Sequence, residues 1–128
     1  VLQFAWPLFI CWPKKLKEKL KMYWDIKQDN NYNLYSPLNN LEVDFISALS
    51  HIDLSANNII DASEIAFTES VKLALSKCNA AHLEVHKSFV VVIGNMLSMS
   101  DLEKLFVVVP TISEAIDYIY MEELEKNL

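Results

Sequence analysis

Residues 58–72, NIIDASEIAFTESVK, join a short apolar strand to the start of a helix, with hydroxyl side chains at the junction. The run at 59–62 is apolar around one aspartate, which is typical of a buried strand. Thr68 or Ser70 can cap the following helix, because a hydroxyl oxygen accepts hydrogen bonds from the first free N–H groups. A serine there also meets the positive end of the helix dipole, which favours an anion such as phosphate. The stretch therefore predicts either an ordinary cap or a surface serine that can be phosphorylated.

The sequence before this stretch predicts a hairpin and then a helix. Residues 20–27 alternate apolar and polar side chains, which indicates a strand from about Leu20, and residues 28–31 have turn composition before a returning strand at 32–35. Ser36 followed by Pro37 predicts the start of a first helix, which we expect to reach about Ser50. Its expected inward stripe is Leu38, Leu41, Phe45, Ala48, Leu49 and Ile52.

The sequence after it alternates helices with apolar strands. The second helix is expected to turn Val71, Ala74, Leu75, Cys78 and His82 inward. Residues 89–93, FVVVI, predict a central strand that is covered on both faces. A turn at 94–95, a short helix at 100–105, a strand at 106–109 and a helix from the capping box Thr111–Glu114 follow. This order predicts an α/β fold, with an N-terminal hairpin and a mixed β-sheet covered by helices.

Composition excludes several classes of function. The chain has 128 residues, enough for one domain, and its net charge of −6 argues against nucleic acid as a main partner. It contains no arginine, and its single glycine, Gly94, rules out a glycine-rich phosphate loop. Two cysteines, Cys11 and Cys78, do not make a disulfide framework. No apolar run reaches the roughly 18–20 residues of a membrane span, so we expect a cytoplasmic protein for which a membrane partner is unlikely.

Residues 1–21 differ from the remainder and are interpreted as an N-terminal extension to a domain at 22–128. Residues 1–12 are apolar and aromatic, and residues 14–21 contain five lysines. An apolar run followed by lysines can be the cytoplasmic end of a membrane segment. The alternatives are a helical or irregular arm that lies against the domain, or a leader that is not native to it.

No cluster of residues predicts catalysis or a metal. Cys78, His82 and His86 are spaced four residues apart, so the outer two lie roughly 12 Å apart along a helix and cannot share one ion. We expect Cys78 and His82 in the core and His86 on the rim. Ser70 lacks the small neighbours that the nucleophile elbow of a hydrolase requires. We therefore expect no enzyme, no metal and no cofactor.

Two blocks of sequence resemble the STAS domains of bacterial anti-sigma factor antagonists. Residues 58–70, NIIDASEIAFTES, are similar to the family's strand and loop, which read roughly V-I-x-D-x-S-x-V-x-F-x-D-S-S-G. Residues 101–106 and 109–119, with PTISEA at 110–115, are similar to its closing strand and final helix. The resemblance covers about 22–128 and implies a divergent member with a STAS-like mixed sheet.

The resemblance implies a non-enzymatic regulatory module. Ser70 falls at the phosphoacceptor serine, and Asp61, Glu69, Val71 and Lys72 fall at partner-binding positions. The implied partner is an anti-sigma factor that is also a serine kinase and is released when the serine is phosphorylated. Lys72 stands where the family has glycine, which predicts weaker switching. The alternatives are a constitutive protein-interaction domain that has lost its switch, or the cytoplasmic STAS tail of a membrane anion transporter.

Overall fold

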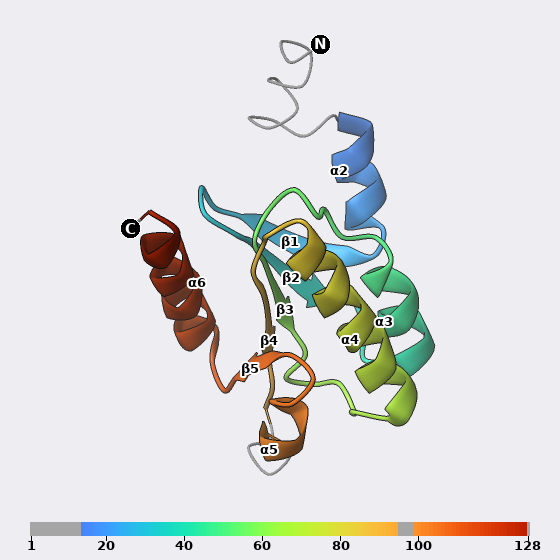
Figure 1. Cartoon of the computed structure of the whole chain (residues 1–128). Helices are drawn as coiled ribbons and strands as arrows, with labels where there is room; N and C mark the ends of the chain where they lie inside the picture. The colour runs from blue at the N-terminus through green and yellow to red at the C-terminus, as the bar shows by residue number, and fades with distance from the viewer. Residues whose placement is uncertain (1–13, 95–98, 128) are drawn as a thin grey trace.

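The computed structural model describes residues 14–94 and 99–127, which form one mixed sheet and its covering helices (Figure 1). The interpretations of residues 1–12, of Cys11 and of a turn at Asn95 lie outside the described residues. In chain order the elements are α2 (Lys14–Lys21), β1 (Trp24–Gln28), β2 (Asn33–Pro37), α3 (Glu42–Leu49), β3 (Asn58–Asp61), α4 (Glu69–Glu84), β4 (Phe89–Val92), α5 (Met99–Leu102), β5 (Val107–Val109) and α6 (Ile112–Lys126).

The five strands lie side by side in the order of the sequence, β1-β2-β3-β4-β5. The β1–β2 hairpin is antiparallel, with Trp24 opposite Pro37 and Gln28 opposite Asn33. The later neighbours pair in parallel, because a helix returns the chain between successive strands. The predicted α/β class, with an N-terminal hairpin and a mixed sheet, is confirmed.

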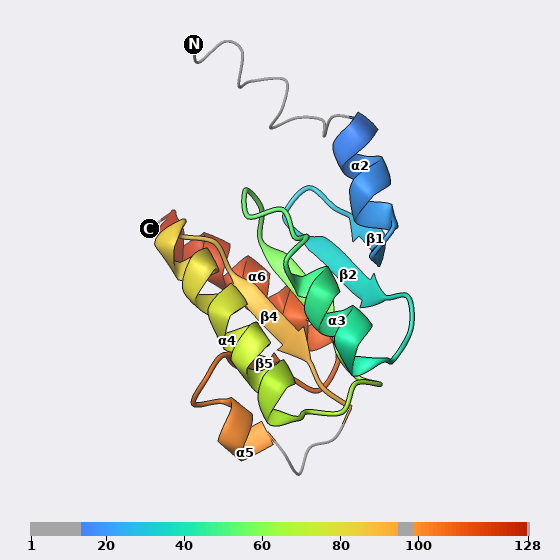
Figure 2. The same ribbon diagram turned by 90° about the vertical axis from the view of Figure 1, so that its right-hand side faces the viewer.

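Helices cover both faces of the sheet, as two perpendicular views show (Figures 1 and 2). α3 and α4 pack on one face, over a core that includes Phe45, Leu75 and Val91. α6 packs on the other face, over a core that includes Val90 and Ile119. β4 supplies buried side chains to both cores and is uniformly apolar, as predicted for a central strand, and β3 supplies Ile59 to one core and Ile60 to the other.

The strand predicted from about Leu20 starts later than expected. Leu20 belongs to α2, where its side chain is 3% exposed, and β1 begins only at Trp24. The Trp24 indole N–H donates to the carbonyls of Ala48 at 2.9 Å and His51 at 3.2 Å, which fixes the start of β1 against α3. Alternation alone could not separate the last turn of a helix from the strand that follows it.

The helix start predicted at Ser36 and Pro37 is wrong, because both residues end β2 and α3 begins at Glu42. Proline is tolerated in β2 because Pro37 pairs with Trp24 of β1, whereas the pairing of β2 with β3 ends at Tyr35. The missing N–H of Pro37 is therefore not needed by β3.

Asn39 supplies the start signal of α3. Its side-chain oxygen accepts a hydrogen bond from the Leu41 N–H at 2.9 Å, and its amide donates to Asp44 at 3.0 Å. Leu38 and Leu41, predicted to face inward, are instead 56% and 65% exposed, because they precede the helix. The inward positions Phe45, Ala48 and Leu49 are confirmed as buried.

The remaining elements lie close to their predicted places. α6 begins after Thr111, whose hydroxyl oxygen accepts from the Glu114 N–H at 3.2 Å, as predicted for a capping box. Among the helices of residues 14–94 and 99–127, none is both long and apolar enough to cross a bilayer.

Candidate functional site

Ser70 is the second residue of α4, and its side chain is exposed. Of the two candidate caps, the structure selects Thr68, whose hydroxyl oxygen accepts a hydrogen bond from the Val71 N–H at 3.3 Å. Ser70 is therefore not needed to cap the helix. It lies within the first turn, where the positive end of the helix dipole favours added negative charge.

Thr68 also joins the two helices on this face of the sheet. Its hydroxyl donates to the carboxylate of Glu42, the first residue of α3. One hydroxyl thus caps α4 and ties the first turns of α3 and α4 together. This contact sets the position of Ser70 relative to α3.

Asp61 shapes the loop that leads to α4. It is the last residue of β3, and its Oδ1 accepts from the Ser63 N–H at 3.2 Å and from the Ser63 hydroxyl at 2.7 Å. An aspartate that bonds two residues ahead closes a tight local turn. The carboxylate of this predicted partner-binding residue is therefore engaged within the loop.

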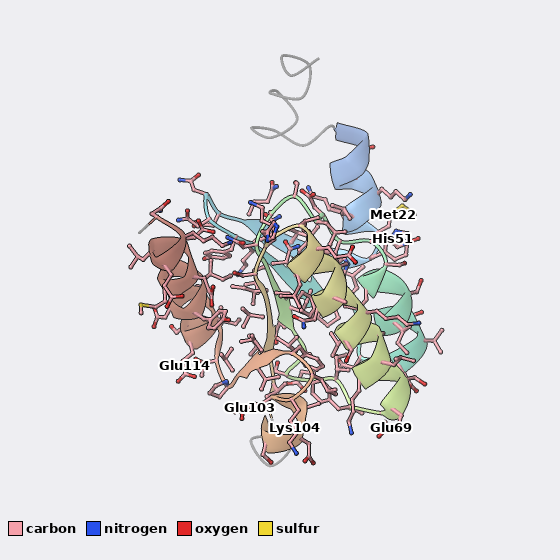
Figure 3. The ribbon with its side chains drawn as sticks, in the orientation of Figure 1. Met22, His51, Glu69, Glu103, Lys104 and Glu114 are labelled. Atoms are coloured by element: carbon pink, nitrogen blue, oxygen red, sulfur yellow. The ribbon has the colours of Figure 1, made fainter. Side chains whose placement is uncertain are left out.

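Glu69 and Lys72 flank Ser70 and form an ion pair. Glu69 Oε1 and Lys72 Nζ are 3.3 Å apart, and the two side chains are 93% and 29% exposed. Glu69 is the first residue of α4, and Figure 3 shows it at the lower end of this helix. Because an exposed pair of this kind contributes little to stability, either side chain can turn toward a new charge at Ser70.

Val71 does not lie on the same surface. Its side chain is 0% exposed and belongs to the core between α4 and the sheet. Of the four positions predicted to bind a partner, Val71 is therefore removed from any surface that a partner could touch. The other prediction for Val71, that it belongs to the inward stripe of α4, is confirmed.

An apolar groove between α3 and α4 opens beside Ser70. The hollow has a volume of about 360 Å³ and is lined by Ile46, Leu49, Ser50, Ser70, Leu73, Ala74, Lys77 and Cys78. Leu73 is 58% exposed and lines the hollow, so it adds apolar surface that a partner can reach. The sequence pattern identified Ser70 but not the groove. The one feature of the sequence that indicates the groove is Leu73, an apolar residue outside the predicted inward stripe of α4.

Cys78 lines the groove and is half-buried, with an unreactive thiol. Its Sγ donates to the carbonyl oxygen of Leu49 at 3.5 Å. Burial raises the pKa of the Cys78 thiol to about 11, so the thiol stays protonated at neutral pH. A protonated, hydrogen-bonded thiol is a poor nucleophile and a poor metal ligand.

His82 is buried, and both of its ring nitrogens form hydrogen bonds within the core. Its Nδ1 lies 2.6 Å from the carbonyl oxygen of Cys78, which can only accept, so Nδ1 carries the proton. Nε2 then accepts from the side-chain amide of Asn58 at 2.8 Å. Burial lowers the pKa of His82, and the hydrogen bond to Cys78 partly opposes this shift.

His86 lies beyond the end of α4 with a φ of 58°, in the left-handed region. His82 is buried as predicted, whereas Cys78 is half-buried. In the part of the chain that the structure describes, no group of three or more His, Cys, Asp or Glu side chains is arranged to hold a metal ion.

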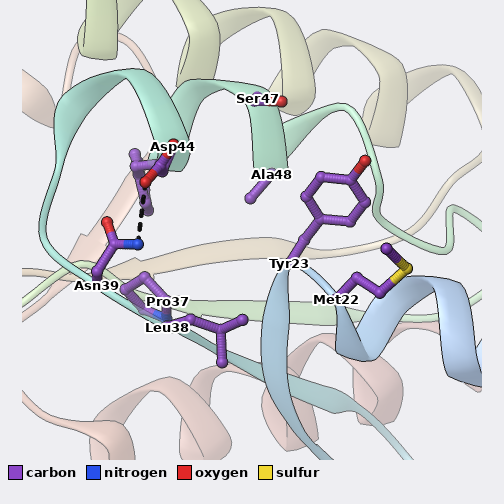
Figure 4. A pocket seen from close by; sticks show the side chains of 9 residues that line it. Met22, Tyr23, Pro37, Leu38, Asn39, Asp44, Ser47 and Ala48 are labelled. Carbon is purple, nitrogen blue, oxygen red and sulfur yellow. Dashed lines mark hydrogen bonds between the residues drawn. The ribbon is translucent and has the colours of Figure 1, made fainter.

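A second hollow lies between the start of β1, the end of β2 and α3 (Figure 4). Its volume is about 240 Å³, and its lining includes Met22, Tyr23 and Leu38. Two of the polar side chains in its wall, Asn39 and Asp44, bond to each other at 3.0 Å. This pair helps to fix the start of α3.

Comparison with known proteins supports the fold alone. No protein-family model matches the chain, and no curated protein matches it. A solved structure, "NMR Structure of the protein TM1081", is similar, with a TM-score of 0.59 and 15% sequence identity over 76% of this chain and 88% of that one. This likeness indicates a shared arrangement of strands and helices.

Proposed function

We propose that this chain is a non-enzymatic regulatory module of the STAS type, which binds an anti-sigma factor with serine kinase activity and is released when Ser70 is phosphorylated. One observation carries the proposal: Ser70 is exposed in the first turn of α4, on the rim of the apolar groove. The mixed sheet with its N-terminal hairpin is the fold that the sequence resemblance implies, which supports the assignment.

The groove suits a protein partner better than a small substrate. The surface of its lining is mainly apolar, although four of its eight lining residues carry polar groups: Ser50, Ser70, Lys77 and the unreactive Cys78. Protein interfaces are commonly anchored by an apolar side chain that fills a desolvated pocket beside polar groups on the rim. An apolar side chain of the partner would fill the groove and bring the partner's surface over Ser70.

Phosphorylation would then oppose binding by simple electrostatics. A phosphate adds about −1.5 to −2 charge at neutral pH and is strongly hydrated. On Ser70 it would stand next to Glu69 at the edge of an apolar contact, where burying the charge is costly. The dipole of α4 favours the phosphate in the free and in the bound domain, so it offsets part of the cost of the added charge without itself driving release.

Lys72 should limit the size of this switch. Its ammonium group already pairs with Glu69 across Ser70 and can turn toward the phosphate instead. Partial neutralisation would leave less repulsion at the interface. We therefore expect the substitution Lys72→Gly to increase the loss of partner affinity upon phosphorylation.

The first test is phosphate transfer, for which Ser113 provides a matched control. Ser113 is the exposed second residue of α6 and follows the cap Thr111, as Ser70 follows Thr68. The protein is incubated with ATP and a cognate anti-sigma factor kinase, and its intact mass is measured. One phosphate on the wild type and on Ser113→Ala, but none on Ser70→Ala, is expected. Phosphate on Ser70→Ala would refute the assignment.

The second test is partner affinity. Ser70→Asp should weaken binding by about tenfold, because it places a charge at the rim of the apolar contact. Ser113→Asp should leave affinity unchanged. Equal affinity of Ser70→Asp and the wild type would contradict the switch.

The groove itself is tested by a pair of leucines on one helix. Leu73 and Leu83 both belong to α4 and are 58% and 66% exposed, but only Leu73 lines the groove. Leu73→Glu should abolish partner binding, whereas Leu83→Glu should preserve it. Circular dichroism of both variants controls for folding, and equal binding by the two would overturn the groove as the interface.

The ion pair between Glu69 and Lys72 also favours a second function, a constitutive interaction domain without a switch. Lys72 stands where a partner's backbone approaches a glycine in the STAS family, and its side chain is engaged with Glu69 at 3.3 Å. This alternative predicts that Leu73→Glu still abolishes binding, but that neither phosphate transfer nor Ser70→Asp has an effect.

A further inference from the structure

β1 forms one edge of the sheet, and its outer side has no strand beside it among residues 14–94 and 99–127. α2 ends at Lys21, before β1 begins, and extends away from the sheet in both perpendicular views (Figures 1 and 2). An edge strand presents backbone N–H and C=O groups that another strand can bind. β1 therefore offers a surface for pairing with a further strand.

The register of the hairpin shows which residues of β1 turn their backbone groups to the outer side. The Asp29 N–H donates to the Tyr32 carbonyl at 2.9 Å, and this pair continues the register of β1 with β2. Because hydrogen-bonded pairs alternate along an antiparallel ladder, the backbone groups of Lys27 and Asp25 also point toward β2. The residues between them point their backbone groups outward: Trp24, Ile26 and Gln28.

The two charged side chains of β1 make its outer edge complementary to itself. Asp25 and Lys27 are exposed, and they lie on the face of the strand opposite to the Ile26 side chain. A second β1, antiparallel and related by a two-fold axis at Ile26, brings Asp25 of each copy opposite Lys27 of the other. An axis at Asp25 or at Lys27 would instead place like charges opposite each other, which is unfavourable. The charges therefore select the register centred on Ile26.

This register also satisfies the backbone and the apolar side chain at the edge. It places Ile26 opposite Ile26 and Trp24 opposite Gln28, so residues with outward backbone groups face each other and can exchange two hydrogen bonds per pair. Ile26 is half-buried against the core of its own domain, and its exposed part would meet the same side chain of the second copy. Burial of this apolar surface adds to the attraction between the charged pairs.

We propose that β1 pairs with β1 of a second copy of this chain, antiparallel and centred on Ile26, so that two five-stranded sheets join into one. A lysine alone on an edge strand opposes pairing, whereas Asp25 two residues before Lys27 turns the repulsion between two copies into attraction. A strand of an unrelated protein could use the same backbone groups, but it would match this order of charges only by chance.

The groove at Ser70 stays uncovered in this pairing, because α3 lies between the groove and β1. α3 contributes Ile46 and Leu49 to the groove, and Ser47 and Ala48 to the hollow at the start of β1. The two-fold axis between antiparallel strands of one sheet is perpendicular to that sheet, so both grooves would open on the same face of the dimer. The pairing itself does not depend on the role of Ser70.

The test is sedimentation velocity of the full chain over a range of concentrations at physiological salt. A reversible shift toward twice the mass of one chain is expected at high concentration, because a ladder of five residues buries little area. Lys27→Asp or Asp25→Lys alone places like charges opposite each other and should weaken association by about tenfold or more. The matched controls, Lys104→Asp and Asp117→Lys, make the same charge changes at exposed positions outside β1 and should associate as the wild type does.

Exchange of the two charges separates the register from any effect on folding. A mixture of the Lys27→Asp and Asp25→Lys variants should form a heterodimer, because each aspartate then meets a lysine again. The double variant Asp25→Lys with Lys27→Asp should likewise associate by itself.

The backbone contribution is tested at Gln28. Gln28→Pro removes an outward N–H that β2 does not use and should weaken association, whereas Gln28→Ala keeps the N–H and should not. Three outcomes would overturn the proposal: a monomer at every concentration, association that the single charge reversals leave unchanged, or a mixture of the two variants that associates no better than either alone.

Discussion

Replacing Gly94, the single glycine of the chain, should destabilise the protein by steric crowding. Gly94 follows β4, where the chain passes the loop after β3. A β-carbon built on Gly94 would lie 2.6 Å from the backbone carbonyl oxygen of Ser63. Since such a contact is several tenths of an ångström too short, Gly94→Ala forces one of the two backbones to move.

The backbone at Ser63 is held too firmly to move without cost. Asp61 binds both the N–H and the hydroxyl of Ser63, at 3.2 and 2.7 Å. One residue earlier, the Ala62 N–H donates to the carbonyl of Val92 at 2.9 Å. Overpacking of a tight site costs about 1–3 kcal/mol, and the reduced freedom of the unfolded chain returns about 0.4–1 kcal/mol. Because the φ of Gly94 is not positive, no further backbone strain is added. The net loss is expected to be about 1–2 kcal/mol.

Urea unfolding followed by circular dichroism measures this loss. We expect a lower midpoint with an unchanged slope, and a melting temperature lower by roughly 4 °C per kcal/mol. Ser63→Ala serves as the control, because it removes the hydroxyl but keeps the carbonyl oxygen that Gly94 approaches. The double variant should therefore be no more stable than Gly94→Ala. A midpoint of Gly94→Ala at or above that of the wild type would refute the reasoning.

Four further substitutions, at three positions, test the contacts and the backbone at the two ends of α4. Thr68→Ala removes the cap of α4 and its bond to Glu42 and should cost about 1–2 kcal/mol in urea unfolding, whereas Thr68→Ser should cost only a few tenths. The pKa of His82 is lowered by burial, so the unfolded state binds more protons: stability should be full above about pH 6.5 and fall below it. His82→Gln should flatten this dependence, and an unchanged slope would contradict the buried neutral ring bonded to Asn58. His86→Gly relieves a left-handed residue and should raise stability by up to about 1 kcal/mol, which the same unfolding assay would detect.

The central strand at 89–92 was predictable because burial on both faces requires an apolar side chain at every position. Residues 89–93 are uniformly apolar, and such a run can pair on both edges while packing under helices on both faces. The region around Pro37 was not predictable from local rules. A serine followed by proline is compatible with a helix start and with the end of a strand. The choice depends on Trp24, whose pairing with Pro37 and bond to Ala48 are contacts between distant parts of the chain.

The candidate site also has a part that the local sequence predicts and a part that depends on contacts between distant residues. Ser70 followed from a local pattern, because a helix start has a recognisable sequence. The helical spacing also assigned Val71 to the core, and the family pattern that made it a partner contact could not override that geometry. The groove depends on how α3 lies against α4, which the contact between Thr68 and Glu42 helps to set. No motif within either helix carries that information.

The two threonine-capped helices show that position on a helix cannot by itself select a serine for modification. Ser70 and Ser113 are both exposed second residues, and both follow a threonine whose hydroxyl accepts a backbone N–H. Both serines therefore lie at comparable positions relative to a helix dipole, and the apolar groove beside Ser70 has no counterpart among the contacts described for Ser113. If the kinase finds Ser70 by seating in this groove, Leu73→Glu should slow phosphate transfer to Ser70 as much as it weakens binding. Intact-mass kinetics would measure the rate, and normal transfer to a variant that no longer binds stably would show that the kinase reads the loop before α4 instead.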